Sequence, residues 1–537
     1  MHLTYDYVIV GAGSAGCVLA ARLSEAADAT VLLIEAGRAD TNPYIHMPVG
    51  FYKMTAGGLT WGFRTAPQRH ADGSEIPYAQ GRVVGGSSSI NAQVFTRGCP
   101  EDYDAWATDL GCTGWAFDEV RPYFLRMEDN DALSGPYHGI DGPLGVSTPS
   151  PQRLTRAFVQ ACQQRGMPYN PDFNGPNQAG AGAYQTTTRN ARRCSAAVAY
   201  LHPARGRANL TIRKDVMVSR IVVDNGRAAG VEIIEDGRPT RVHAEAEVIV
   251  TAGAIGSPKL LLLSGIGPAD EIRAHGLDVV AELPGVGRNL HDHYGVDIVY
   301  ELSGAHSLDR YSRLHWKAWA GLEYLLFRSG PVASTIVEGG AFWFAEPGAA
   351  TPDLQFHFLV GAGVEAGVPS IPSGSGCTLN SYTLRPRSRG RVVLRSANPA
   401  DAPVIDPNFL DDPYDLRIST EGVRASREIM NQPALAKYVR KEHFPGEGVR
   451  SQAELEDYVR RFGRTSYHPV GTCRMGVDDG AVVTPELRVR GIDNLRVCDS
   501  SIMPRLVSSN TNAPTLMIAE KASDLIRGNH AGERPSG

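Results

Sequence analysis

Three glycines and one acidic residue near the start of the chain have the spacing of a dinucleotide-binding site. Gly11, Gly13 and Gly16 form a G-x-G-x-x-G pattern, and an acidic residue, Glu35, follows nineteen residues later. The glycines permit a tight turn, a close approach of pyrophosphate to the backbone, and close packing of a helix on a strand. A helix that begins at this turn offers free N–H donors to phosphates, and Glu35 can accept hydrogen bonds from a ribose. The pattern predicts a bound nucleotide but does not distinguish FAD from NAD.

Two further segments could contact a flat or charged ligand. The sequence GRVVGGSSSINAQVFTRG at 81–98 is rich in small residues, which leave backbone donors uncovered, although an ordinary surface loop is the alternative. Near the C-terminus, Pro514 suits the first turn of a helix. Asn512 and Ala513 should therefore sit at a helix entrance, where the N–H donors and the dipole stabilise an anion.

The histidines and cysteines do not predict a metal site. His291 and His293, in NLHDH, are of a metal-ligating type, but no third ligand follows at useful spacing. The eight cysteines are scattered and contain no C-x-x-C pair, so we expect reduced, structural thiols.

These residues need particular elements to position them. The glycine pattern lies between a strand-like run, YDYVIV at 5–10, and a helical run, CVLAARLSEA at 17–26. A second strand-like run, TVLLIEAG at 30–37, contains Glu35 and completes a βαβ unit. The sequence thus places the three glycines and the acid on one nucleotide-binding unit.

Other elements follow along the chain. Residues 209–252 read as strands joined by tight turns at Asn225-Gly226 and Asp236-Gly237. The segment GAIGSPKLLLLSGIG at 253–267 reads as a glycine turn with a short helix from Pro258. Near the end, NLRVC at 494–498 predicts a strand that stops before Asp499, and residues 514–526 predict a helix.

Length and composition limit the class of protein. The chain has 537 residues, 42% hydrophobic and 21% charged, which is typical of a soluble protein with two or more domains. The net charge of −5 argues against a nucleic-acid binder. The sequence contains no run of 18 apolar residues and no basic region before an apolar stretch at the N-terminus, so we expect neither a transmembrane segment nor a cleaved export signal. We therefore predict a location in the cytoplasm, or peripherally at the inner face of a membrane.

Taken together, these segments resemble the glucose–methanol–choline (GMC) family of FAD-dependent oxidoreductases over nearly the whole chain. The glycine pattern, residues 81–98, residues 253–267, and the pair HPVGTCRMG at 468–476 with NTNAPTLMIAEKASD at 510–524 match in family order. Three segments, at 40–54, 76–86 and 327–343, look most like the L-sorbose dehydrogenases of this family. Bacterial primary-alcohol and choline dehydrogenases are wider neighbours.

The resemblance implies an α/β (α+β) fold with two domains. A Rossmann-like FAD-binding domain would be assembled from the discontinuous segments 1–155, 205–300 and 460–530. A substrate-binding domain, with a mixed or antiparallel sheet backed by helices, would comprise 156–204 and 301–459. Residues 531–537 would form a polar tail.

The resemblance also assigns a set of FAD-binding residues. The pyrophosphate would be bound by Gly11, Gly13, Ser14, Ala15 and Gly16. Glu35 with Ala36 would bind the adenosine ribose, the backbone of Val216 the adenine, and Asp499 the pyrophosphate and ribityl chain. The flavin would be bound by Val83, Gly86, Ser87, Asn91, Ala92, Val94, Asn512 and Ala513. Trp61 would either edge the flavin or simply pack. Some relatives link FAD covalently through a histidine in the glycine-serine loop. Ile90 takes that place here, so we predict non-covalent FAD.

The family chemistry is alcohol oxidation, in which flavin N5 accepts a hydride and a histidine removes the hydroxyl proton. His468 matches the family's base, and Pro469 restricts its backbone. Asn512 matches the second catalytic position, where its amide could stabilise the alkoxide. Glu338 and His357 could face a polyol substrate, but a structural role is the favoured interpretation of both.

The resulting prediction is an FAD-dependent dehydrogenase that oxidises an alcohol group of a sugar or polyol, L-sorbose to L-sorbosone in the first instance. Electrons would pass to a quinone or an artificial acceptor. Three alternatives remain: a primary-alcohol or choline dehydrogenase of the same family, an oxidase that uses O2, and a non-redox lyase or photodecarboxylase on the same fold.

Overall fold

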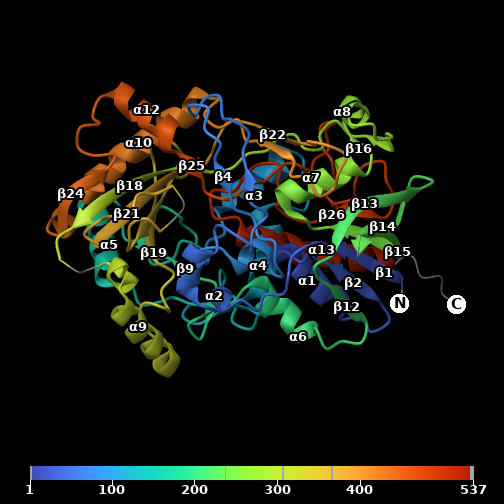
Figure 1. The fold of residues 1–537 in the computed structure, drawn as a ribbon, viewed down its shortest axis with the longest axis horizontal. Helices are drawn as coiled ribbons and strands as arrows, with labels where there is room; N and C mark the ends of the chain where they lie inside the picture. The colour runs from blue at the N-terminus through green and yellow to red at the C-terminus, as the bar shows by residue number, and fades with distance from the viewer. Residues whose placement is uncertain (1–2, 236, 305–306, 365–366, 532–537) are drawn as a thin grey trace.

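The structure is a computed structural model that describes residues 3–235, 237–304, 307–364 and 367–531. It contains two halves, each built around a seven-stranded sheet (Figure 1). Residues 532–537 of the predicted polar tail, and Asp236 of the second predicted turn, lie outside the described residues.

The first sheet holds the predicted nucleotide-binding unit. Its strand order is β12-β2-β1-β15-β14-β13, and β26 also pairs with β15. The strands are β1 (Thr4–Val10), β2 (Val31–Ile34), β12 (Leu210–Arg213), β13 (Met217–Asp224), β14 (Arg227–Glu235), β15 (Arg238–Val250) and β26 (Leu495–Val497). β12, β2, β1, β15 and β26 run parallel. The parallel pair of β1 and β2 is joined by a crossover helix, as such a pair requires. The turn between β13 and β14 is made by Asn225 and Gly226, both with positive φ (50° and 77°), as the sequence predicted.

Helices from distant parts of the chain cover this sheet. α1 (Ser14–Leu23) connects β1 to β2, and it contacts the C-terminal helix α13 (Asn512–Ala531), which in turn contacts α4 (Phe117–Met127). α7 (Gly253–Leu263) begins five residues before the predicted start at Pro258 and contacts β13. The glycine turn is therefore surrounded by elements from both ends of the chain.

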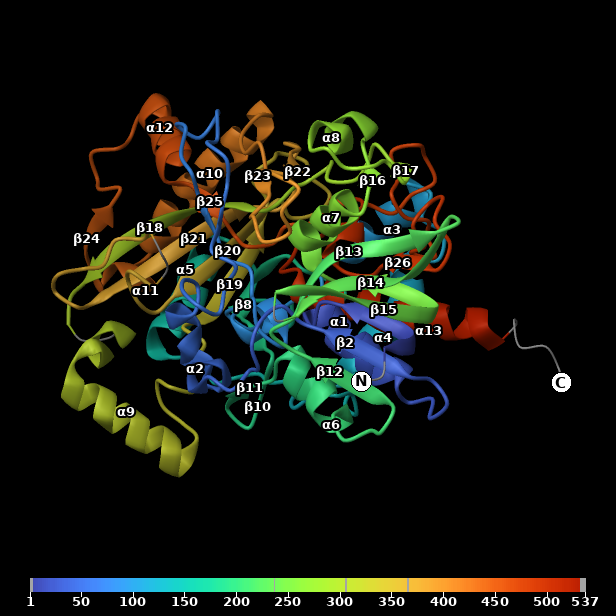
Figure 2. The same ribbon diagram turned by 45° about the vertical axis from the view of Figure 1, so that its right-hand side comes forward.

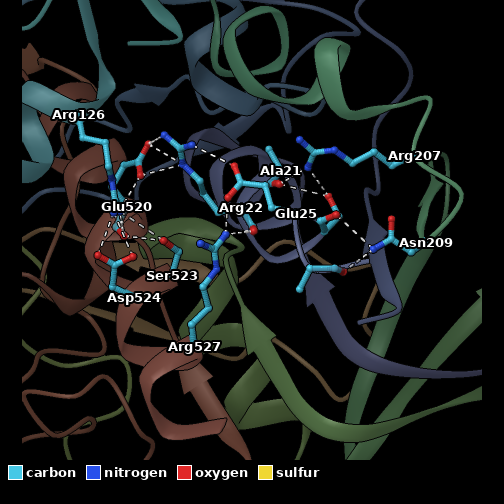
Figure 3. Close-up of polar contacts among 12 residues, drawn as sticks. Ala21, Arg22, Glu25, Arg126, Arg207, Asn209, Glu520, Ser523, Asp524 and Arg527 are labelled. Carbon is cyan, nitrogen blue, oxygen red and sulfur yellow. Dashed lines mark hydrogen bonds and ion pairs between the residues drawn. The ribbon is translucent and has the colours of Figure 1, made fainter. Parts of the chain in front are cut away.

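An ion-pair cluster ties these helices together (Figure 3). The fully buried carboxylate of Glu520, on α13, lies 2.9 Å from Arg22 Nη2 on α1 and 2.8 Å from Arg126 Nη2 on α4. Tyr200 Oη donates a further hydrogen bond of 2.8 Å to Glu520 Oε1. A buried charge needs such partners, so α13 is fixed against both α1 and α4.

The second sheet is antiparallel throughout. Its strand order is β24-β18-β21-β20-β19-β8, with β25 also paired to β18. The strands are β8 (Gly180–Ala183), β18 (Tyr294–Leu302), β19 (Val337–Trp343), β20 (Leu354–Leu359), β21 (Gly376–Thr383), β24 (Val439–Phe444) and β25 (Arg464–Thr465). α5 (Arg153–Gln164) and α10 (Pro413–Met430) contact the sheet, and α12 (Gln452–Phe462) packs on α10. α9 (Leu314–Phe327) stands away from the rest of this half (Figure 2).

The predicted fold class is confirmed. Strands from the start, middle and end of the chain share the first sheet, and an antiparallel sheet with helices forms the second half. The chain passes from the first half to the second before residue 300, because β18, which belongs to the second sheet, starts at Tyr294. β25, which lies within the predicted segment 460–530, also belongs to the second sheet.

Candidate active site

One large cavity reaches from the glycine turn of the first half to the second sheet. Most of the predicted site residues line it: Gly11, Gly13, Ser14, Ala15, Glu35, Ala36, Trp61, Gly86, Ser87, Asn91, Ala92, Val94, Val216, His357, His468, Asp499 and Asn512. Four predicted residues do not line it: Gly16, Val83, Ala513 and Glu338. Segments that are far apart in sequence therefore converge on one site.

The glycine turn has the shape that a pyrophosphate requires. Gly13 is the N-cap of α1, and no side chain caps this helix terminus. A Cβ on Gly13 would meet nothing nearer than the Thr251 carbonyl oxygen at 3.8 Å, so the turn is open toward the cavity. A Cβ on Gly16 would lie 1.9 Å from the Gly11 oxygen, so this glycine serves helix packing, not ligand contact. Uncapped N–H groups facing an open cavity suit a diphosphate.

Glu35 lies at the end of β2, beside this turn. Its carboxylate accepts hydrogen bonds from the backbone N–H groups of Ala12 (2.9 Å) and Gly37 (2.7 Å). Burial raises the pKa of Glu35 to about 7. The backbone N–H of Val216 donates to the Glu35 carbonyl oxygen at 3.0 Å, so Val216 lies beside the acid, as an adenosine site requires.

The glycine-serine loop packs directly on the glycine turn. A Cβ on Gly86 would lie 2.6 Å from the Gly13 Cα, so the two backbones can meet only because both residues lack a side chain. Ile90 lines the cavity in this loop and carries no atom that could bond to a flavin. Asn91 Oδ1 accepts from Arg193 Nη1 at 2.7 Å, which fixes its amide at the cavity wall.

Asp499 follows β26 and lies where the sequence placed it, at the cavity. One oxygen accepts from the backbone N–H of Gly253 (2.9 Å) and from Ser257 Oγ (2.5 Å), and the other accepts from the Ser501 N–H (2.8 Å). Burial raises its pKa above the usual range. With the open turn and Glu35, the residues present fit an FAD.

Three other predicted flavin neighbours have different surroundings. Trp61 lines the cavity, stacks on Phe63 with ring centroids 5.7 Å apart, and carries the Arg82 guanidinium 4.8 Å from its ring. Val83 and Ala513 are buried outside the cavity lining. Trp61 therefore both edges the cavity and packs, whereas Val83 and Ala513 contribute to the core.

His468 lies at the cavity between two polar neighbours. Its Nδ1 is 3.0 Å from His293 Nδ1, and its Nε2 is 3.1 Å from Asn510 Nδ2. Burial and the neighbouring histidines lower the pKa of His468 well below the ordinary value of 6.5. Burial also lowers the pKa of His293 to about 4. Both rings are therefore neutral near pH 7, and each carries one N–H.

The hydrogen bonds assign the two tautomers. His293 Nε2 lies 3.1 Å from the Leu384 carbonyl oxygen, which can only accept, so Nε2 carries the proton and Nδ1 is bare. The Nδ1 of His468 must then carry the proton that it donates to His293. The Nε2 of His468 is left as a bare lone pair that accepts from Asn510, at the cavity.

The NLHDH segment, which the sequence suggested only as a weak metal motif, holds His468 in place. Asp292 accepts a hydrogen bond of 2.8 Å from the backbone N–H of His468. This bond supports the unusual backbone before it, where Tyr467 has φ of 62°. His291 accepts from the Leu506 N–H at 2.8 Å and lies 2.7 Å from the Asn289 oxygen. Both flanking histidines are thus committed to hydrogen bonds.

The asparagine that contacts His468 is Asn510, not the predicted Asn512. Asn510 Oδ1 accepts from Thr96 Oγ1 and from Gln355 Nε2, each at 3.1 Å, which turns its amide nitrogen toward His468. Asn512 starts α13, and its Oδ1 accepts from Ser14 Oγ at 2.8 Å. Asn512 therefore joins the N-termini of α1 and α13. The partner of His468, Asn510, lies two residues before the start of α13.

The two predicted substrate residues differ in position. His357 lines the cavity, its Nε2 accepts from Gln355 Nε2 at 2.9 Å, and burial lowers its pKa to about 3. Glu338 does not line the cavity, which agrees with the structural role and not with a substrate contact. Its oxygens accept from Gln152, Thr155 and Ser334 at 2.6–3.1 Å. Glu338 therefore anchors the start of α5 to β19.

Comparisons with known proteins agree with this arrangement. Residues 5–295 and 386–519 match two models described as GMC oxidoreductase. The alcohol dehydrogenase [acceptor] of Pseudomonas putida is 42% identical over 528 residues, covering 97% of this chain and 95% of that protein. The mitochondrial choline dehydrogenase of Homo sapiens is 43% identical over 539 residues, covering 98% of this chain and 90% of that protein.

Solved structures share the fold of this chain over nearly its whole length. Pyridoxine 4-oxidase from Mesorbium loti aligns with a TM-score of 0.89 at 33% identity, covering 99% of this chain and 100% of that chain. A formate oxidase aligns with a TM-score of 0.92 at 26% identity, covering 99% of both chains. The two family models and these full-length relatives lead to one conclusion: the chain belongs to the GMC oxidoreductase family and is an oxidoreductase of CH–OH groups.

Proposed function

We propose that this protein is an FAD-dependent dehydrogenase that oxidises an uncharged primary alcohol to an aldehyde. The observation that carries the proposal is the bare Nε2 of His468, which faces the cavity with the Asn510 amide 3.1 Å away. A neutral imidazole and an amide donor at one point are the groups that alcohol oxidation needs.

FAD bound in this cavity would supply the hydride acceptor, flavin N5. The substrate hydroxyl replaces the Asn510 amide on the lone pair of His468 Nε2, which then takes the hydroxyl proton, while Nδ1 keeps its own proton in the bond to His293. Asn510 Nδ2 donates to the substrate oxygen as it becomes an alkoxide. The carbon loses a hydride as the oxygen loses a proton, so a C=O bond forms and the two electrons leave with the hydride.

The charge of the cavity wall supports an uncharged substrate. Among the described lining residues the carboxylates are Glu35 and Asp499, and both are held by backbone N–H donors near the glycine turn. Neither accompanies His468. A choline headgroup would lack a counter-charge there. His357 and Tyr382, whose rings lie 4.8 Å apart, instead give this region a neutral polar and aromatic wall.

The relatives favour the predicted alternative, a primary-alcohol or choline dehydrogenase, over L-sorbose oxidation. We keep sugars as a tested substrate class, because His357 lines the cavity and could bind a hydroxyl group. We further propose that FAD is bound without a covalent link, since Ile90 takes the linking position. For the electron acceptor we propose a quinone, in line with the acceptor-dependent relative.

An anaerobic substrate panel tests the proposal. Purified protein would be mixed without oxygen with linear and aromatic primary alcohols, L-sorbose and choline, while the flavin absorbance is followed. We expect bleaching by uncharged primary alcohols and a rate about 10²–10⁴-fold lower in His468→Ala. Bleaching by choline alone would refute the substrate class, and unchanged rates in His468→Ala would refute the base. Comparing dye reduction with peroxide release in air then separates a dehydrogenase from an oxidase.

A further inference from the structure

The helix α9 exposes an unusual amount of apolar surface. Twelve large hydrophobic side chains are exposed among the described residues, and half of them lie on this helix of 14 residues. They are Leu314, Trp319, Leu322, Leu325, Leu326 and Phe327, with exposed fractions of 49–84%. Soluble proteins rarely expose so contiguous an apolar patch without a partner.

The outward face of α9 is the apolar face. Ala320 and Tyr324, one turn apart, are buried against the rest of the protein, and Tyr324 Oη donates to the Ala191 carbonyl oxygen at 3.0 Å. Leu314, Leu322 and Leu325 recur at helical spacing on the opposite side, so they point away from the body. Figures 1 and 2 show the helix projecting from the second half, with its outer side unpaired in both views.

Basic residues surround this apolar strip. Arg313 and Arg328 lie at the two ends of the helix, and Lys317 lies between them; all three are exposed. Residues 307–330 have a net charge of +2, although the whole chain has −5. The two acidic residues in this segment are Asp309, whose carboxylate accepts bonds from the Ala362 and Gly376 N–H groups, and Glu323 on α9, and both are included in this net charge.

We propose that α9 lies in the surface of an anionic phospholipid bilayer, with its leucines and Trp319 among the acyl chains and its basic residues at the headgroups. An apolar helix face with Trp and flanking Lys and Arg is the composition of an interfacial helix. Fourteen residues extend for about 21 Å, too short to cross a bilayer. Among the residues that the structure describes, no helix combines the length and apolar composition needed to span a membrane.

The charge pattern favours lipid over a second copy of the chain. In a two-fold contact of α9 with itself, each basic end would face basic residues of the other copy, which is repulsive. The position of the helix also connects the lipid surface to the active site. After α9 the chain returns to the cavity wall: the Val332 oxygen accepts from the Val49 N–H, and Phe51 and Val337 line the cavity.

Vesicle sedimentation of the purified holoenzyme tests this proposal. Vesicles of phosphatidylglycerol and phosphatidylcholine would be compared with phosphatidylcholine alone. We expect binding to the anionic vesicles that weakens as salt is raised, since about 1 kcal/mol per basic residue, or roughly fivefold, comes from the surface potential. Leu322→Asp with Leu325→Asp should abolish binding, and Arg313→Glu with Lys317→Glu should weaken it at least about tenfold.

Matched controls keep the result specific. Val280→Asp with Val477→Asp changes two exposed apolar residues elsewhere and should leave vesicle binding intact. Each variant should keep the flavin content and the thermal unfolding midpoint of the wild type, which shows that it is folded. Trp fluorescence should shift to the blue with anionic vesicles, and the shift should shrink in Trp319→Phe.

Two outcomes would overturn the proposal. One is the absence of vesicle binding by the wild type. The other is a particle mass in solution that falls from dimer to monomer in the Leu322→Asp, Leu325→Asp variant, which would assign this face to a second copy of the chain. The readouts do not use substrate, so a wrong substrate class would not affect them.

Discussion

The Nδ1 atoms of His293 and His468 lie 3.0 Å apart, so only one of the two rings can place a proton between them. The carbonyl of Leu384 forces His293 to carry its proton on Nε2, which makes His293 the acceptor. His293 thereby keeps the lone pair of His468 at Nε2, at the cavity. The proposed base is oriented by a residue that does not itself line the cavity.

We predict that His293→Leu lowers kcat by about 10²-fold with little change in KM, because the bare lone pair of His468 would no longer be fixed at Nε2. His293→Asn offers an acceptor oxygen and should restore much of the rate. Steady-state kinetics with the identified alcohol checks both variants. Equal loss in both, or loss confined to KM, would contradict a tautomer-setting role.

Substitutions of Asn510 and Asn512, the two asparagines near the start of α13, should have different effects. Asn510→Ala removes the donor beside His468 Nε2 and should lower the rate of flavin reduction by about 10²-fold with FAD retained. Asn512→Ala breaks the link to Ser14 and should instead weaken FAD retention. Rapid-mixing absorbance and the flavin-to-protein ratio measure the two effects. The opposite assignment would restore Asn512 to the catalytic position.

The Glu520 cluster should contribute strongly to stability. Glu520→Gln leaves Arg22 and Arg126 without their buried carboxylate, and we expect a loss of about 3 kcal/mol in the free energy of unfolding. Glu25→Gln is the matched control, because Glu25 pairs with Arg22 at the surface and should cost less than about 1 kcal/mol. Urea midpoints with unchanged slopes would measure the difference. Similar losses in both variants would show that burial does not matter here.

Acid should destabilise the protein partly through His357. Its folded pKa of about 3 lies below the ordinary 6.5, so between these values the unfolded chain binds a proton that the folded chain does not. Stability is therefore lost as the pH falls below about 6.5, at about 1.4 kcal/mol per pH unit.

His357→Asn should remove this slope, so the wild type should lose about 3 kcal/mol relative to the variant between pH 6.5 and pH 4. Asp292, whose pKa burial raises to about 6, acts with the opposite sign, because its ionised form is a cost that acid relieves. It is present in both proteins and cancels in the comparison. Urea unfolding of both proteins at several pH values measures this effect. A difference in unfolding free energy that stays constant with pH would show that the folded protein does not lower the pKa of His357.

The parts of the site that are local in sequence could be predicted. The turn at Gly11 and Gly13, the helix after it, and Glu35 at the end of the next strand form one continuous unit, so spacing alone locates them. The strands around the Asn225-Gly226 turn are recognisable for the same reason, since the turn and the alternation are short-range.

The catalytic end could not be predicted in the same way. His293 and His468 are 175 residues apart, and they are brought together by the pairing of β18 with β25 and by the hydrogen bond from the His468 N–H to Asp292. The start of α13 at Asn512 agrees with the predicted helix entrance, but Asn510 was missed because motif spacing does not show which amide faces the base. The structural role of Glu338 could be proposed but not specified, because the hydrogen bonds that hold it come from α5 and the loop before β19, which the sequence does not connect.

The first sheet is finished by β26, and α13 closes over the glycine turn, although both lie about 500 residues after that turn in the sequence. Neither segment exists until the ribosome has passed residues 495 and 512. A nascent chain on the ribosome therefore cannot retain its cofactor, however early the N-terminal motif emerges. A premature stop before β26 would release a colourless polypeptide in which Val248, Ile249 and Val250 of β15 lack their partner strand on one edge, a substrate for quality-control proteases.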